Sequence, residues 1–175
     1  MNTSSIILKK ANKIIQLANT RDMIKVAQYL GIKLYFEEDY QNLLGLYTCA
    51  YKTRAIFINN RLNKQLTQLV IAHEIGHDML HRELAKKGAL KEFALFSIRK
   101  DSIEYEANAF AAHLLLDTEQ FIAFAKEGRT TLEIANLMHT EEELVLIKLK
   151  ELVAIGYTLQ LSNYAQGNFL KKYSV

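Results

Sequence analysis

Two histidines and a glutamate in the pattern His73-Glu74-x-x-His77 are the residues of this chain best suited to chemistry. On an α-helix, residues four apart lie on the same face, so both imidazole rings can reach one metal ion. Glu74 lies at the edge of that face, within reach of a water molecule bound to the ion. Two neutral nitrogens beside a carboxylate are the arrangement with which a zinc hydrolase makes hydroxide near neutral pH. We therefore expect Zn²⁺ here, although the same ligand types also suit Mn²⁺ or Fe²⁺.

The sequence around this pattern favours the helix that the chemistry needs. Apolar residues recur there at helical spacing, and the whole chain lacks proline. The stripe consists of Leu66, Leu69, Val70, Ala72, Ile75, Gly76, Met79 and Leu80. Gly76 lowers helix stability by roughly 1 kcal/mol relative to alanine, which is easier to explain if another backbone or a substrate passes close to it. We therefore expect an amphipathic helix that packs into a core.

A zinc site that keeps one position open for water needs a third protein ligand. Residues 102–116 have a strongly helical composition and contain two candidates, Glu104 and Glu106. Glu104 shares a face with Ala107 and Asn108, and such small or polar residues would let a second helix approach the first closely. Glu106 points about 200° away around the helix. We therefore assign the third ligand to Glu104 and expect Glu106 to be a solvated residue.

Asn108 and His81 are candidates for supporting roles. Asn108 follows Glu104 by one turn and can hydrogen-bond a ligating histidine, which fixes the orientation of the ring. His81 follows His77 by one turn, and it can do the same or line the cleft. A zinc peptidase also needs a group that stabilises the oxyanion. The sequence leaves four candidates open for that role, which are Tyr47, Tyr51, Tyr105 and His81.

Together, these motifs resemble the ImmA/IrrE family of zinc metallopeptidases. The resemblance extends from about Ile24 to Leu152 and depends on the pattern His73-Glu74-x-x-His77, followed by Glu104-x-x-Ala107-Asn108-x-Phe110-Ala111-Ala112-x-Leu114-Leu115. It implies that both histidines and Glu104 bind the metal and that Glu74 is the general base. Members of the family often have a proline after the leucines, whereas this chain has none. That departure affects a helix end and not the chemistry.

The resemblance also implies a biological role. Such proteins act inside bacteria or in mobile elements such as phages, and several of them cut a DNA-binding repressor to release stress or element-transfer genes. We therefore expect a zinc endopeptidase whose protein substrate is a helix-turn-helix repressor. The alternative is a non-catalytic regulator that keeps the metal for structure and binds a repressor or DNA. Glu74 favours the enzyme, because a purely structural site has no use for that carboxylate.

Composition and charge fit one globular domain. The chain has 175 residues, 50% of them apolar, and its net charge of +3 is too small to indicate nucleic-acid binding. Its one cysteine, Cys49, excludes an internal disulfide and fits a reducing compartment, and we expect a buried thiol. We find neither a run of about 18 apolar residues nor a secretory signal, so we expect a cytoplasmic protein without membrane contact. His113 lies half a turn from the Glu104 face and should not touch the metal.

The elements expected around these residues form an α+β fold that is mostly helical. Two helices come first, followed by three short segments rich in aromatic and β-branched residues, at 32–36, 43–50 and 54–58. We expect these segments to form a small three-stranded sheet, antiparallel or mixed, against which the His73 and Glu104 helices pack. Residues 1–127 would form the metallopeptidase core with its N-terminal helices, and residues 128–175 a helical subregion packed on that core.

The predicted hairpin from Leu43 to Ile58 directly precedes the first ligand-bearing helix. A peptidase must hold its substrate extended, and an exposed strand edge does so through main-chain hydrogen bonds. The edge of this hairpin is therefore a candidate substrate site, although such edges are commonly covered in proteins. Residues 86–100, between the two ligand-bearing helices, are expected to form a loop or short helix that borders the cleft.

The segment 130–150 predicts a helix, a short turn and a second helix. Thr130 with Glu133 and Thr140 with Glu143 both match the capping-box pattern. The layout resembles a helix-turn-helix, but its second helix starts with three glutamates, which suit the helix dipole and repel phosphates. We therefore expect helical packing or a docking surface for a protein partner, and not nucleic-acid binding.

Overall fold

The structure, a computed structural model, describes residues 2–51, 53–92 and 103–159. In these ranges the chain forms eight helices and four strands, a mostly helical α+β fold as the sequence predicts. The helices are α1 (Thr3–Ala18), α2 (Met23–Tyr29), α3 (Lys64–Leu80), α4 (Arg82–Ala85), α5 (Ile103–Leu115), α6 (Thr118–Lys126), α7 (Thr131–Leu137) and α8 (Glu142–Ala154). The strands are β1 (Lys33–Glu37), β2 (Gly45–Ala50), β3 (Thr53–Asn59) and β4 (Leu90–Glu92).

The sheet has four strands and not the three that we predicted. Its order is β1-β3-β2-β4, with β1 parallel to β3 and the other neighbours antiparallel. β4 lies in the segment 86–100, where we expected a loop or short helix, and residues 93–100 of that segment are outside the described part. Three residues are too few to show a strand pattern in the sequence. β4 exists because it pairs with residues 45–47 of β2, and it covers the hairpin edge there.

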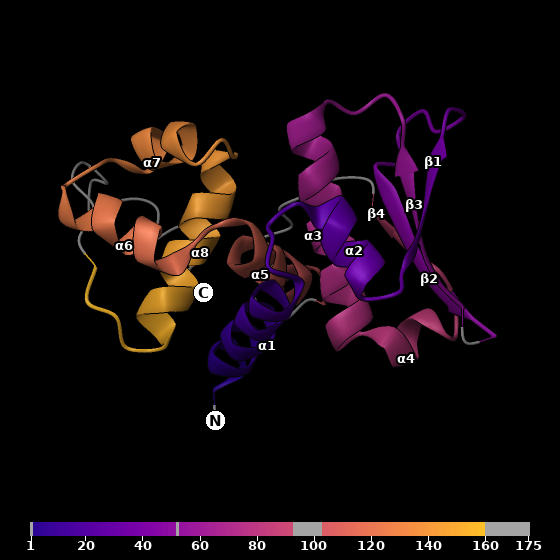
Figure 1. The fold of residues 1–175 in the computed structure, drawn as a ribbon, viewed down its shortest axis with the longest axis horizontal. Helices are drawn as coiled ribbons and strands as arrows, with labels where there is room; N and C mark the ends of the chain where they lie inside the picture. Colours follow the sequence, from indigo (N-terminus) through magenta and orange to yellow (C-terminus); the bar gives the residue numbers. More distant parts are fainter. Residues whose placement is uncertain (1, 52, 93–102, 160–175) are drawn as a thin grey trace, which may run out of the picture.

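Helix α3 is the central element and lies between the sheet and α5 (Figure 1). It contacts α2, β2 and β3 as well as α5. Every residue from Leu69 to Asp78 is therefore buried, including the polar ones. We predicted an amphipathic helix with one apolar face, but the middle of α3 has neighbours on all sides and no solvated face.

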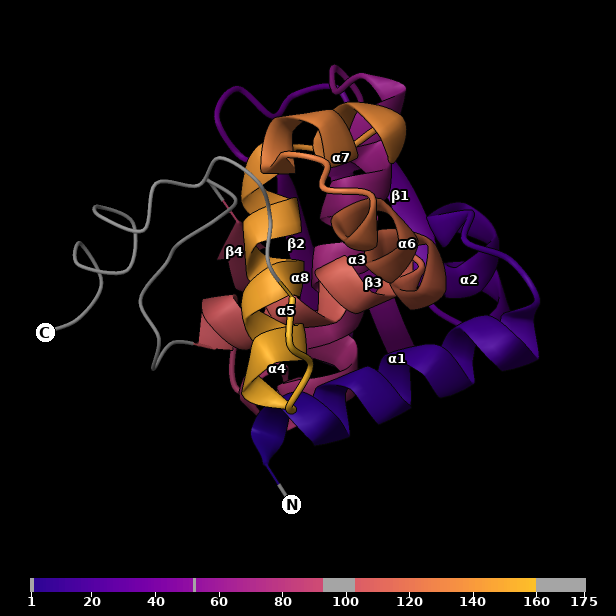
Figure 2. The same ribbon diagram turned by 90° about the vertical axis from the view of Figure 1, so that its left-hand side faces the viewer.

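Two of the remaining helices, α1 and α8, pack against α5. Helix α1 contacts α5, α2 and α8, and α8 lies alongside α5 (Figure 2). Helix α6 contacts α7, and α7 contacts α8, so the C-terminal helices reach the centre of the fold mainly through α8. The division of the chain at residue 127 stays a prediction, and residues 160–175 of its second part lie outside the described ranges. Among the described helices, none is both long and apolar enough to cross a membrane.

The helix, turn and helix predicted for residues 130–150 are present as α7 and α8, but only the first capping box forms. The Glu133 N–H donates to Thr130 Oγ1 at 3.2 Å, and the Thr130 N–H donates to the Glu133 carboxylate at 2.8 Å. The second predicted box is wrong. Helix α8 begins at Glu142, two residues after Thr140, and no side chain caps it. This later start of α8 follows a turn in which His139 has a left-handed φ of 51°. A capping-box pattern in the sequence does not predict such a backbone conformation.

Candidate functional site

The contact between α3 and α5 assembles the candidate site, and Gly76 makes that contact possible. A β-carbon on Gly76 would lie 2.9 Å from both the Cα and the carbonyl oxygen of Ala107 on α5. Carbon atoms do not pack that closely, and neither of those backbone atoms can move without moving the helix. The glycine between the two histidines is therefore explained by the backbone of a second helix, one of the two reasons we considered.

His73, His77 and Glu104 converge at this contact. The Nε2 atoms of His73 and His77 lie 3.0 Å apart. Glu104 Oε2 lies 3.2 Å from the first nitrogen and 3.3 Å from the second. This donor set fits a metal ion, because tetrahedral zinc ligands at about 2.0–2.1 Å from the ion lie roughly 3.3 Å from one another. Both histidines are buried, whereas 29% of the Glu104 side chain is exposed, so the cluster meets solvent at the carboxylate.

The protonation of the two histidines suits metal binding. Burial lowers the pKa of His77 below its usual value, although the hydrogen bond with Glu104 acts in the opposite direction. His77 is therefore a neutral imidazole at physiological pH. For His73, the Oδ1 atom of Asn108 lies 2.9 Å from Nδ1. An amide oxygen only accepts hydrogen bonds, so it holds the proton on Nδ1 and leaves the Nε2 lone pair facing the cluster.

His81 lies next to this cluster and connects it to Glu106. Its Nδ1 atom is 3.1 Å from His77 Nδ1, and its Nε2 atom is 3.0 Å from Glu106 Oε2. Glu106, which we expected to be only solvated, is 41% exposed and yet bonded to a buried ring. The angle of about 200° between Glu104 and Glu106 around their helix did not predict this contact. His81, the residue that follows the last turn of α3, has a φ of −124°, which is not helical, so it lies off the path of the helix. A ring at the end of one helix can meet a long side chain in the first turn of the next.

Glu74 is fully buried on α3, beneath the first residue of β2. A β-carbon on Gly45 would lie 2.7 Å from Glu74 Oε1 and 2.6 Å from Val70 Cγ1. Only glycine leaves room for the carboxylate at this point. The same end of β2 pairs with β4, so Glu74 lies where the helix with the two histidines meets the part of the sheet that β2 and β4 form.

The four oxyanion candidates have different surroundings. The Tyr47 hydroxyl is buried and donates to the Asp78 carboxylate at 2.5 Å. The Tyr105 hydroxyl donates to Glu151 at 2.8 Å. Tyr51 is fully exposed in the turn between β2 and β3, at the opposite end of β2 from Gly45. His81 is engaged on both ring nitrogens, as described above. These surroundings do not assign the oxyanion role to any of the four residues.

Sequence reasoning missed Asp78, which anchors the C-terminal end of α3 directly after His77. Its buried carboxylate accepts hydrogen bonds from Tyr47 on β2, from Arg54 on β3 at 2.8 Å, and from Arg82 on α4 at 2.9 and 3.1 Å. A buried carboxylate is tolerated when it is paired in this way. The spacing of four residues between Asp78 and Arg82 was the only signal in the sequence, because the strand partners are 24 and 31 residues away.

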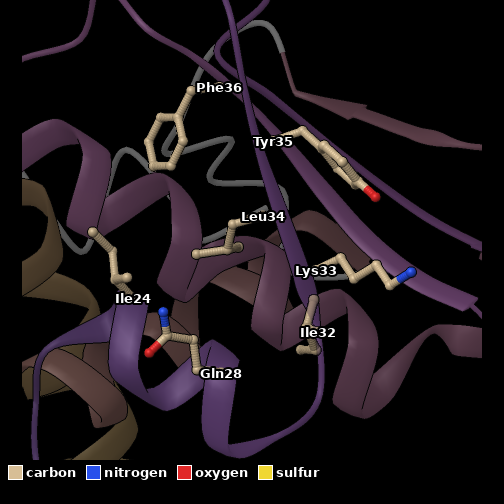
Figure 3. A pocket seen from close by; sticks show the side chains of 7 residues that line it. All are labelled: Ile24, Gln28, Ile32, Lys33, Leu34, Tyr35 and Phe36. Atoms are coloured by element: carbon tan, nitrogen blue, oxygen red, sulfur yellow. The ribbon is translucent and has the colours of Figure 1, made fainter.

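A pocket of about 420 Å³ lies between α2 and β1, and β1 is at the opposite edge of the sheet from β4 (Figure 3). It is lined by Ile24, Gln28, Ile32, Lys33, Leu34, Tyr35 and Phe36. This lining contains no histidine and no carboxylate, so it offers none of the groups that the zinc chemistry requires. The candidate site is therefore the cluster between α3 and α5 and not this pocket.

Comparison with known proteins agrees with the geometry. Residues 27–150 match the Peptidase M78 family, described as the IrrE N-terminal-like domain. The chain is 32% identical over 112 residues to "Uncharacterized immunity region protein 2" of Bacillus phage phi105, a match that covers 64% of this chain and 69% of that protein. It is 30% identical over 114 residues to metallopeptidase ImmA of Bacillus subtilis (strain 168), with 65% of each protein covered. Because the family match spans most of the chain and includes all residues of the cluster, this chain belongs to the Peptidase M78 family of metallopeptidases.

Proposed function

We propose that this chain is a zinc-dependent endopeptidase that cleaves a DNA-binding transcriptional repressor. The observation that carries the proposal is the convergence of two imidazole nitrogens and one carboxylate oxygen beside the buried Glu74. In a chain of a metallopeptidase family, this donor set suits zinc, with His73, His77 and Glu104 as its ligands.

Glu74 is the general base in this proposal. Zinc, when bound, lowers the pKa of its water and polarises the scissile carbonyl. Glu74 takes a proton from the attacking water and passes it to the nitrogen of the leaving amine. Asn108 and His81 hold the two histidine rings in the orientation that presents their Nε2 atoms. Glycine at position 45, the first residue of β2, leaves room for the carboxylate of Glu74.

The substrate lies, in this proposal, along β4. The hairpin edge that we considered first is occupied by β4 at residues 45–47. β4 is the last strand on that side of the sheet within the described ranges. An extended peptide can add to such an edge through main-chain hydrogen bonds, and there it would be separated by one strand, β4, from the end of β2 that covers Glu74.

The choice of a repressor as substrate is supported by the relatives. One of them is named as an immunity region protein of a phage and the other as metallopeptidase ImmA. The first name connects the chain with phage immunity and the second with peptidase activity, and the resemblance described above implies a helix-turn-helix repressor as the protein that is cut. We place this reaction in the cytoplasm, where a DNA-binding repressor acts.

The decisive experiment is Glu74→Gln, tested by co-expression with a candidate helix-turn-helix repressor that the wild-type chain cleaves. We expect the variant to keep its zinc, measured by elemental analysis, and to lose repressor cleavage by a factor of about 10² or more, measured by immunoblot. The matched control is Glu83→Gln, which makes the same chemical change at an exposed glutamate on α4. It should cleave as the wild type does.

Two results would decide against this function. If Glu74→Gln cuts the repressor at the wild-type rate, Glu74 is not the general base. If it inactivates the repressor without cutting it, the chain is a regulator that acts by binding, which is the alternative function. Direct DNA binding is not favoured, because Glu142 and Glu143 occupy the first turn of α8 and would face the phosphates.

A further inference from the structure

Both ring nitrogens of His81 are engaged, and they connect Glu106 to His77. Glu106 Oε2 lies 3.0 Å from His81 Nε2, and His81 Nδ1 lies 3.1 Å from His77 Nδ1. The His81 side chain is 6% exposed, so solvent does not compete strongly for its hydrogen bonds. The far nitrogen of His77, Nε2, is the atom that faces His73 and Glu104.

Glu106, His81 and His77 form a row of hydrogen-bonded side chains. The chemistry of these three groups fixes the positions of the protons along this row. A carboxylate has no proton to donate, so His81 Nε2 carries a hydrogen and donates it to Glu106. In a neutral ring, His81 Nδ1 is then an acceptor. A contact between two nitrogens needs a single hydrogen, and His77 Nδ1 must supply it. His77 Nε2 is therefore left with a lone pair, and this lone pair points into the cluster.

We propose that Glu106 is a positioning residue of the metal site, which acts through His81 to hold His77 in the tautomer that binds metal. His73 reaches the same state by a shorter route, because Asn108 Oδ1 accepts from its Nδ1 directly at 2.9 Å. A neutral histidine beside His77 can accept or donate, so His81 alone does not specify the tautomer. The carboxylate at the end of the row removes that ambiguity.

A surface ion pair is the simpler explanation of the His81–Glu106 contact, since 41% of the Glu106 side chain is exposed. Such a pair would be independent of the metal. The positions of the atoms argue against independence, because the other nitrogen of the same buried ring contacts His77, the proposed ligand. Removal of Glu106 should therefore change zinc binding, which a plain surface pair would not do.

The first test measures the zinc dissociation constant of the full chain by competition with a chelator. We expect Glu106→Ala to weaken zinc binding by about 10–100-fold, the range typical of partners that orient metal ligands. Glu106→Gln should bind nearly as the wild type does, because its amide oxygen still accepts from His81. Glu119→Ala removes an exposed glutamate of α6 and should have no effect. Equal affinity of Glu106→Ala and the wild type, or equal loss in Glu106→Ala and Glu106→Gln, would overturn the proposal.

The second test asks whether Glu106 acts only through His81. In a double-mutant cycle, Glu106→Ala should cause no further loss of zinc affinity in a chain that already carries His81→Ala. Additive losses would show that Glu106 acts on the site by another route, and the proposal would be wrong.

The third test uses only the wild-type chain, so its result cannot be caused by a variant that fails to fold. In the zinc-loaded wild-type chain with ¹⁵N-labelled histidine, the imidazole shifts should show His81 with its proton on Nε2. A proton on Nδ1 would contradict the row of hydrogen bonds. The inference rests on the proposed metal site, but the two fail differently. A wild-type chain that binds no Zn²⁺ would overturn the proposed function, whereas equal binding with and without Glu106 would overturn only this inference.

Discussion

Two polar clusters lie beside helix α5, one near each of its ends, and each contains at least one buried histidine. The two clusters differ in the chemical group that contacts the histidine nitrogen. Near its N-terminus, the histidine–glutamate cluster of His73, His77 and Glu104 sets three lone-pair atoms around one point. Near its C-terminus, in the lysine cluster, Lys148 Nζ lies 2.9 Å from both His113 Nδ1 and Thr118 Oγ1. The amine of Lys148 takes the position that a metal ion would need. A buried histidine is thus a candidate ligand only where its lone pair faces other lone pairs.

Burial acts on both clusters, with different consequences. It lowers the pKa of His77, which keeps that ring neutral and ready for a metal. In the lysine cluster, burial together with the charge of Lys148 lowers the pKa of His113 to about 2. Burial and the charge of Arg21 also lower the pKa of Lys148, from 10.5 to about 7, although the carboxylates of Asp117 and Glu151 oppose them. The first cluster therefore has a state suited to binding, while the charge state of the second affects the stability of the fold.

The largest effect expected from this comparison concerns metal content. Glu104→Ala removes a proposed ligand, so its loss of zinc affinity should exceed the roughly 10–100-fold loss that orienting partners produce. His113→Gln alters a histidine on the same helix that faces a lysine, and it should keep the zinc affinity of the wild type. Chelator competition on both variants checks the contrast. A drop in His113→Gln equal to that in Glu104→Ala would erase the distinction between the two clusters.

The next effect is the pH dependence of stability that Lys148 should cause. Above pH 7 the folded chain holds Lys148 neutral while the unfolded chain, with its pKa of 10.5, still binds the proton. The free energy of unfolding therefore rises with pH, by about 3 kcal/mol between pH 7 and 9.5. Urea unfolding at several pH values measures this. In Lys148→Met the rise should vanish, because no amine remains to be neutralised; a rise of the same size in the variant would mean that another group causes it.

The lysine cluster should also lose stability in acid. His113 stays neutral in the folded chain down to a pKa of about 2, whereas its usual value is 6.5. The unfolded chain binds the additional proton between these values, so the free energy of unfolding falls as the pH drops below about 6.5. His113→Gln should have a weaker dependence than the wild type in urea unfolding between pH 6.5 and 4.5. An unchanged slope would show that burial does not hold His113 neutral.

The smallest effect is on the free energy of unfolding and concerns the close approach of α3 and α5. The histidine–glutamate cluster needs this approach, because its proposed ligands come from both helices, whereas the lysine cluster does not. Gly76→Ala places a β-carbon 2.9 Å from the backbone of Ala107 and should lower the free energy of unfolding by about 1–3 kcal/mol. The helix propensity of alanine offsets part of this, by at most about 1 kcal/mol. Gly88→Ala is the matched control, because a β-carbon there has no neighbour within 4 Å. If thermal unfolding shows both variants equally stable, the two helices have room to move apart.

Much of this site could be predicted from the sequence because its signals are local. The spacing of His73 and His77 places both rings on one face of a helix, whatever the helix packs against. The choice of Glu104 over Glu106 used the same geometry, and the structure brings Glu104 to the two histidines. Helices α1, α2, α3, α5, α7 and α8, the first three strands and the α+β class also follow from composition and periodicity, which depend on neighbours in the chain.

Tertiary structure alone decided the rest, because those features depend on residues that are far apart in the sequence. β4 is a strand only through its pairing with β2, and the burial of α3 on all sides needs both the sheet and α5. His81 meets Glu106 because one ends α3 and the other lies in the first turn of α5. His113 meets Lys148 across 35 residues of sequence. A periodic pattern predicts which face of a helix a side chain occupies, but only packing determines which residue it contacts there. That contact decides whether a buried histidine, such as His77, can bind a metal or, like His113, is bonded to a lysine.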